Sequence, residues 1–123
     1  MPRDDIAGGL RDALDAGDEL ALAALLHPDV RMLVDSGDSD GVDARGRAAV
    51  ARFLLARRAR RRGDVLEPVQ VNGCPGLAVR RGDGLVVGVL AADVGPDGRI
   101  EAVWLSTSAP KLAHWNRGRS GAD

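Results

Sequence analysis

The spacing of apolar residues changes near residue 30, and this change restricts the chain to a fold that combines helices with a β-sheet. Before that point Ile6, Leu10 and Leu14 recur every four residues, which is typical of an amphipathic helix. After residue 65, short apolar runs are separated by glycine-rich turns, which are typical of strands. We therefore predict one α+β domain over residues 1–116, followed by a disordered polar tail over 117–123.

The same pattern predicts three helices and five strands. The helices are expected over 4–16, over 19–27 and from Gly46 onward, and the strands over 30–35, 66–71, 77–81, 85–94 and 99–106. Gly17 is placed to end the first helix, and Asp18 to cap the second. The 85–94 strand is almost entirely apolar, so we expect one of its faces to meet the helices and the other a second copy of the protein. A homodimer through the sheet is the predicted assembly.

Composition argues against several classes of function. The 17 basic and 18 acidic residues nearly balance, which argues against nucleic-acid binding. Cys74 is the only cysteine, so an intrachain disulfide is impossible, and the two histidines add no metal-ligand spacing. No apolar stretch approaches the roughly 18 residues of a membrane span, and no signal peptide is recognisable. We expect a cytoplasmic protein without metal or cofactor that does not bind membranes.

A carboxylate lies where the first strand is expected to end. The strand ends on Asp35, a loop or distorted edge strand over 36–43 follows, and an Arg-Gly step then opens the third helix. If this strand packs against that helix, Asp35 lies at the mouth of a pocket, where it would transfer a proton or anchor a small ligand. The alternative is a turn residue, because an Asp before Ser-Gly readily bonds its own backbone.

Several short phrases resemble the NTF2-like, or SnoaL-like, superfamily of cone-shaped α+β domains. They are Ala16-Gly17-Asp18, His27-Pro28-Asp29-Val30 and the segment from Arg45 to Val50. Three further segments resemble, more narrowly, the C-terminal SnoaL-like domain of extracytoplasmic-function sigma factors. They are Val71 to Leu77, Gly98-Arg99-Ile100 and Ala109 to Leu112. The resemblance implies a cone in which a curved, mixed or antiparallel sheet of about five or six strands packs against three helices.

The superfamily includes ketosteroid isomerases, limonene epoxide hydrolases and polyketide cyclases. Asp35 matches the position of the isomerases' general base. Their oxyanion donor is a Tyr on the first helix, but Leu10 takes that position and this chain has no Tyr. Loss of such a donor removes about 3 kcal/mol of transition-state stabilisation, so isomerase activity of the familiar type is not expected. A cofactor-free isomerase or polyketide-cyclase-type enzyme with Asp35 as general base stays an alternative.

Other candidate catalytic groups have plainer explanations. The hydrolase route would need an Asp-Arg-Asp set such as Asp35, Arg80 and Asp93. Nothing in the spacing of these three residues distinguishes them from others. The cyclase route could use Glu101 or His27, but a strand glutamate faces solvent or a dimer seam, and a histidine at a helix end favours the helix dipole.

The preferred interpretation of the resemblance is a domain that binds a small hydrophobic molecule in its cone. Asp35 would be the polar anchor. The expected wall residues are Leu10, Met32, Phe53, Leu90 and Trp104. Trp104 is placed in phase with Ile100 and Ala102 on the last strand, and ordinary core packing is its alternative role. Trp115 is expected to anchor a C-terminal helix over 111–116.

A third hypothesis is a regulatory module that contacts a sigma factor or RNA polymerase, as the resemblance to fused sigma-factor domains implies. Because the sequence begins at the domain itself, we expect it to stand alone. The arginine-rich segment 57–62 is interpreted as a solvated helix end, with contact to an acidic partner protein as its alternative.

Overall fold

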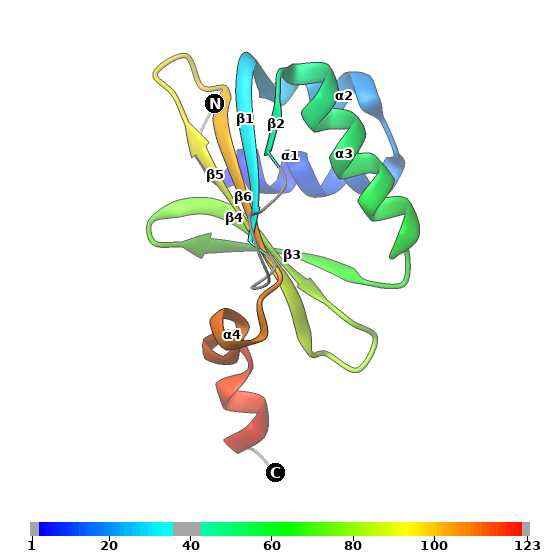
Figure 1. Ribbon diagram of the computed structural model, residues 1–123, viewed down its shortest axis with the longest axis vertical. Coiled ribbons are helices and arrows are strands. Elements are labelled where there is room, and N and C mark those ends of the chain that lie inside the picture. Colours follow the sequence, from blue (N-terminus) through cyan, green and yellow to red (C-terminus); the bar gives the residue numbers. More distant parts are fainter. Residues whose placement is uncertain (1–2, 36–42, 122–123) are drawn as a thin grey trace.

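In the first half of the chain two helices precede two strands and a third helix, and strands dominate the second half (Figure 1). The computed structural model describes residues 3–35 and 43–121. The helices are α1 (Arg3–Ala16), α2 (Glu19–Leu25), α3 (Arg47–Arg60) and α4 (Ala109–Gly121). The strands are β1 (Leu26–Asp35), β2 (Asp43–Arg45), β3 (Val65–Val71), β4 (Cys74–Arg80), β5 (Val86–Val94) and β6 (Ile100–Ser106). The predicted α+β class is confirmed, and α4 contains the C-terminal helix expected over 111–116.

The described strands form one mixed six-stranded sheet in the order β2-β1-β6-β5-β4-β3. Strands β1 and β6 pair in parallel, and every other neighbouring pair is antiparallel. Figure 1 shows α1, α2 and α3 on one side of the sheet, while α4 lies at the lower end of the view. The face that α1, α2 and α3 cover is called the inner face below, and the opposite one the outer face.

Local signals fixed the junction between the first two helices. Gly17 adopts a positive φ of 66°, where a glycine carries no Cβ penalty, and ends α1. The Asp18 carboxylate accepts a hydrogen bond from the Ala21 amide at 3.1 Å and so caps α2. Both predictions are confirmed. The second helix ends at Leu25 instead of residue 27, because His27 precedes Pro28 and is restricted away from helical angles.

The inner face holds the main hydrophobic core. Leu10, Leu22, Leu26, Val30 and Val50 are completely buried between the helices and the sheet. Helix α3 begins after Gly46, whose amide bonds the Val30 carbonyl at 2.8 Å and ties the helix start to β1. The three helices of the first half therefore form the layer that the sequence predicts.

The outer face is covered at one end by α4. Leu112 and Trp115 pack there against Val86 and Val89, so the predicted role of Trp115 as an anchor is confirmed. The Asn116 side chain accepts a hydrogen bond from the Val86 amide at 2.8 Å and donates one to the Val86 carbonyl at 3.0 Å. The chain's own helix thus covers part of the face that the sequence assigned to a second copy.

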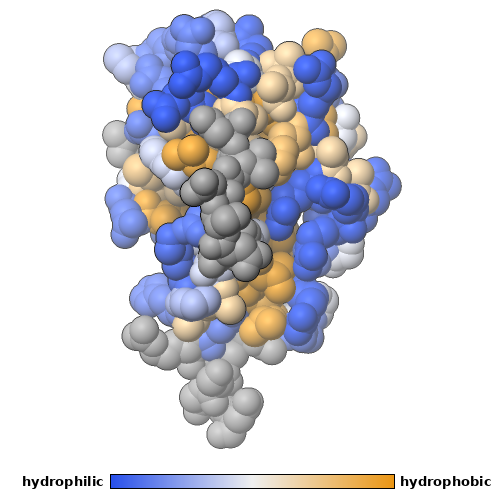
Figure 2. All heavy atoms as spheres, viewed as in Figure 1, coloured by the Kyte–Doolittle hydropathy of each residue, from blue (hydrophilic) through white to orange (hydrophobic). Residues whose placement is uncertain are grey.

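The predicted boundaries differ from the observed ones near both loops and ends. Helix α4 reaches Gly121 and so includes most of the tail expected over 117–123, while residues 122–123 lie outside the described residues. The loop or edge strand expected over 36–43 contributes β2 at its end, and 36–42 also lie outside the described residues. Within the described ranges, no helix is both long and apolar enough to cross a membrane. In the space-filling view, apolar side chains form a band flanked by hydrophilic ones (Figure 2).

Candidate functional site

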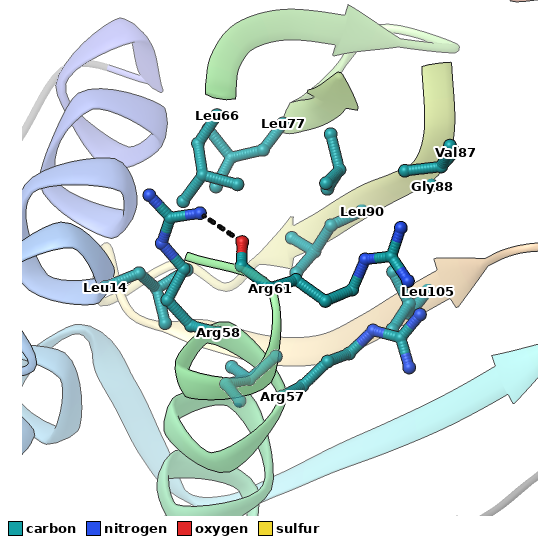
Figure 3. A pocket seen from close by; sticks show the side chains of 12 residues that line it. Leu14, Arg57, Arg58, Arg61, Leu66, Leu77, Val87, Gly88, Leu90 and Leu105 are labelled. Carbon is teal, nitrogen blue, oxygen red and sulfur yellow. Dashed lines mark hydrogen bonds between the residues drawn. The ribbon is translucent and has the colours of Figure 1, made fainter. Parts of the chain in front are cut away.

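An apolar hollow lies on the inner face, between the ends of α1 and α3 and the strands β3 to β6 (Figure 3). It is partly open to solvent and has a cavity volume of about 50 Å³. Its apolar lining consists of Leu14, Leu54, Leu66, Leu77, Val79, Val87, Gly88, Leu90 and Leu105. Its polar lining consists of Arg57, Arg58 and Arg61.

The strand register explains the floor of this hollow. Leu77, Leu90 and Leu105 are direct partners across β4, β5 and β6, so their side chains form one row on the inner face. The neighbouring row pairs Leu66 with Val79 and Val79 with Gly88. Gly88 has no side chain to fill its place in that row.

Gly88 therefore helps to make the space. A Cβ added there would meet the Val79 side chain at 3.6 Å, which is an ordinary contact distance. A register shift between Val79 and Arg80 accompanies this glycine, and it brings Val87 into the lining as well. The hollow is thus a consequence of one missing side chain and one irregular strand pairing.

Two of the three arginines are held by carboxylates and carbonyls. Arg58 donates to Asp15 Oδ1 at 2.7 Å and to the main-chain oxygens of Asp64 at 2.7 Å and Arg61 at 3.1 Å. Arg61 donates from Nε to Asp64 Oδ2 at 2.7 Å, and Asp64 is buried. Both guanidinium groups are thereby oriented and their charges are compensated.

Arg57 differs from its two neighbours. Its guanidinium is half-buried, and neither a hydrogen bond nor an ion pair joins it to any of the described residues. Burial lowers the pKa of Arg57, and the positive charges of Arg61 and Arg60 lower it further, while Asp64 opposes the shift. Figure 3 shows the side chains of Arg57 and Arg61 extended in the same direction, toward Leu105.

No family model and no curated protein sequence matches the chain. Among solved structures, the chain is similar to the extracytoplasmic-function sigma factor SigJ of Mycobacterium tuberculosis, with 29% sequence identity and a TM-score of 0.69. The match covers 89% of this chain and 43% of SigJ. A SnoaL-like protein of unknown function from Burkholderia thailandensis is 16% identical with a TM-score of 0.61 over 82% and 89% of the two chains. The chain has the SnoaL-like, NTF2-like fold.

A third similar structure is a candidate polyketide cyclase from Sinorhizobium meliloti, which is 25% identical with a TM-score of 0.60 over 85% of this chain and 94% of that one. The predicted resemblance to SnoaL-like proteins, including a sigma factor of the extracytoplasmic-function class, is confirmed. The present chain spans less than half of the length of SigJ.

The predicted wall residues lie at different depths on the inner side of the SnoaL-like domain. Leu90 lines the hollow. Leu10 and Met32 are completely buried in the core beside it, and Phe53 packs against that core while half-exposed. The structure therefore brings these four residues into one hydrophobic cluster, of which one member reaches the hollow.

Asp35 and Trp104 lie on the outer face. They help to line a separate, shallow and open depression, together with Leu33, Val34, Leu105, Ser106 and Lys111. The Asp35 carboxylate forms an ion pair with Lys111 of α4. The sheet thus separates this carboxylate from the hollow.

The predicted phase of Trp104 with Ile100 is wrong because β6 contains a β-bulge. Asp93 and Val94 are consecutive on β5, but they pair with Ala102 and Ile100, so Glu101 is the extra residue. Ile100 is fully buried on the inner side, whereas Trp104 is 43% exposed. Side chains of a strand alternate between the two faces of the sheet, and an inserted residue reverses that alternation for the residues beyond it.

The other candidate catalytic groups do not converge. Arg80 forms an ion pair with Glu67 and also donates to the Gly84 carbonyl. His27 Nδ1 accepts a hydrogen bond from the Asp29 amide at 3.0 Å. Asp93 and Glu101 are exposed on the strands, and Cys74 is half-buried where β4 begins. Within the described part of the chain, no group of three His, Cys, Asp or Glu residues could hold a metal ion.

Sequence reasoning missed the arginines of the hollow. Segment 57–62 was interpreted as a solvated helix end, yet three of its arginines line an apolar space. The signal was their position along α3 and its C-cap. Arg57 and Arg58 lie three and four residues after the buried Leu54, and Arg61 lies four and three residues after them, so these arginines continue the buried face of the helix.

Proposed function

We propose that this SnoaL-like domain binds a small hydrophobic molecule in the hollow of its inner face. The observation that carries the proposal is the apolar lining, which α1, α3 and four strands contribute around a space left by Gly88. Apolar clefts with a few polar groups at one side are the usual form of small-molecule sites.

The size of the hollow limits the ligand. Its cavity volume of about 50 Å³ holds more than one water molecule but is far below the roughly 300–1,000 Å³ of sites for drug-sized ligands. At this volume the enclosed part holds only a few carbon atoms of an aliphatic chain, so the rest of the ligand lies in the open mouth beside the arginine side chains. A larger ligand requires the long arginine side chains at the mouth to move aside.

Filling the hollow tests the proposal. In Val79→Phe the larger side chain occupies the space beside Gly88, and we expect the Kd for a neutral apolar probe, 1-hexanol, to rise about tenfold or more in an NMR titration. Val65→Phe is the matched control, because Val65 is 58% exposed on β3 and does not line the hollow. Equal affinities of the wild type and Val79→Phe would contradict the proposal.

The geometry does not favour the enzyme alternative with Asp35 as general base. A base of this kind needs apolar walls that raise the pKa of its carboxyl group. Asp35 is instead half-exposed on the outer face and ion-paired with Lys111.

A second candidate function is regulation of a sigma factor or RNA polymerase by direct contact. The similarity to SigJ favours it, because both the identity of 29% and the TM-score of 0.69 exceed those of the Burkholderia and Sinorhizobium structures. Size-exclusion chromatography of the purified domain with a sigma factor of this class tests it. Co-elution supports this function, and separate elution at concentrations well above the micromolar range contradicts it.

We also propose that the outer face packs against a second copy of the chain. Leu33 and Trp104, which are direct partners on β1 and β6, are 39% and 43% exposed there. Trp104→Glu is expected to convert a dimer into a monomer in sedimentation velocity, whereas Val65→Glu, at another exposed position, leaves the dimer intact. A monomeric wild type would contradict this assembly.

A further inference from the structure

We propose that Arg57 is the polar anchor of the hollow, and that its ligand is a small apolar carboxylate with the hydrocarbon part against the leucines and the carboxylate on this guanidinium. The inference rests on the proposed function, since it names the chemical class of the molecule in the same hollow. It also assigns the anchoring role to a different residue from the one that the sequence suggested.

The first step is the charge balance at the mouth. Three guanidinium groups line the hollow, and two carboxylates, those of Asp15 and Asp64, bond to them. Asp15 is engaged by Arg58, and Asp64 by Arg61. One positive charge, that of Arg57, therefore has no carboxylate in contact with it among the described residues.

The second step is the environment of that charge. Arg57 is half-buried against apolar side chains, and Arg60 and Arg61 repel its charge, which is why its pKa falls below the ordinary value. Arginine still stays protonated at neutral pH. A ligand anion placed beside Arg57 relieves this repulsion, and the low polarity of the lining strengthens the attraction.

The third step is the choice of anion. A guanidinium presents parallel N–H donors that match the two oxygens of a carboxylate. Among the described residues, one guanidinium at the mouth has no hydrogen-bond or ion-pair partner, and two carboxylates lie nearby. A dianion such as a phosphate monoester therefore meets repulsion from Asp15 and Asp64 that is not fully offset. A monoanion with an apolar body matches both the single charge and the leucine-lined floor.

A pair of probes that differ only at the polar end tests the inference. The Kd values of hexanoate and 1-hexanol are measured by NMR titration for the wild type, Arg57→Met and Arg52→Met. Methionine keeps an unbranched apolar stem over the lining but removes the charge. Arg52 is exposed on the same helix and does not line the hollow, so Arg52→Met controls for the change in net charge.

We expect Arg57→Met to weaken hexanoate binding about tenfold and to leave 1-hexanol binding unchanged. Arg52→Met is expected to change neither Kd. Arg57→Lys keeps the charge without the two-pronged donor and is expected to fall between wild type and Arg57→Met. Thermal unfolding of each variant verifies that the domain is folded during the titrations.

The outcomes separate this inference from the proposed function. One outcome is that Arg57→Met binds each probe with the same Kd as the wild type, while Val79→Phe weakens the binding of both probes. In that case the hollow binds apolar molecules, but the assignment of a carboxylate ligand to Arg57 is overturned. If Val79→Phe has no effect on either probe, the hollow is not the binding site, and both proposals fail.

Discussion

The two faces of the sheet are made by the same strands, yet they differ in both cover and chemistry. The inner face lies under α1, α2 and α3 and combines a buried apolar core with a hollow that arginines line. Of the described elements, α4 covers one end of the outer face, which carries exposed apolar residues beside the ion pair of Asp35 and Lys111. Alternate residues of one strand therefore serve different purposes: the inner set lines the hollow between helices and sheet, and the outer set lines an open depression.

The largest expected effect separates the two faces by stability. Leu10→Ala on the inner face removes a completely buried side chain and is expected to lower the free energy of unfolding by about 2–5 kcal/mol. At a protein concentration that keeps the chain monomeric, Leu33→Ala on the outer face removes a side chain that is 39% exposed, and its effect is expected to be below about 1 kcal/mol. Urea denaturation of both variants measures the difference. Equal losses would show that the outer face is buried in solution.

A smaller effect is expected where α4 covers the outer face. Asn116→Ala removes the partner of both the Val86 amide and the Val86 carbonyl and is expected to lower the free energy of unfolding by about 1–3 kcal/mol. Hydrogen exchange at the Val86 amide should accelerate at the same time. Ala113→Ser, at an exposed position of the same helix, is the control. Unchanged exchange at Val86 would show that α4 is held in another way.

The smallest effect is expected at the ion pair of the outer face. Lys111→Met removes the ion pair with Asp35, but the side chains of Lys111 and Asp35 are 61% and 43% exposed, so water already screens their attraction. We expect the free energy of unfolding to change by less than about 1 kcal/mol, and less still at high salt. A larger loss in urea denaturation would indicate that Asp35 is more strongly coupled to α4 than its exposure implies.

Features that depend on neighbouring residues were predicted well. Gly17 and Asp18 were assigned to their turn and cap because positive φ values and N-terminal caps are properties of a few consecutive residues. The strand expected over 85–94 matches β5 (Val86–Val94) within one residue at its start, since a continuous apolar run bounded by glycine turns is also a local signal.

Features that depend on strand pairing were predicted less well from the sequence. The inner or outer position of Trp104 depends on the extra residue Glu101, which is recognisable only when β6 is aligned with β5. The first strand begins at Leu26 and not at Val30, because Leu26 pairs with Ile100 of β6. Register is a property of two strands together, so a single segment does not contain it.

The sequence by itself determined the order of helices and strands, the caps between them and the likeness to SnoaL-like domains. Only the tertiary structure decided which side of the sheet Asp35 faces, and that Gly88, Val79 and Arg57 surround a common hollow. The physical reason is the range of the interactions. Helix and turn preferences are set within a few residues, whereas a cavity is set by side chains that distant segments bring together, and by the one side chain that glycine lacks.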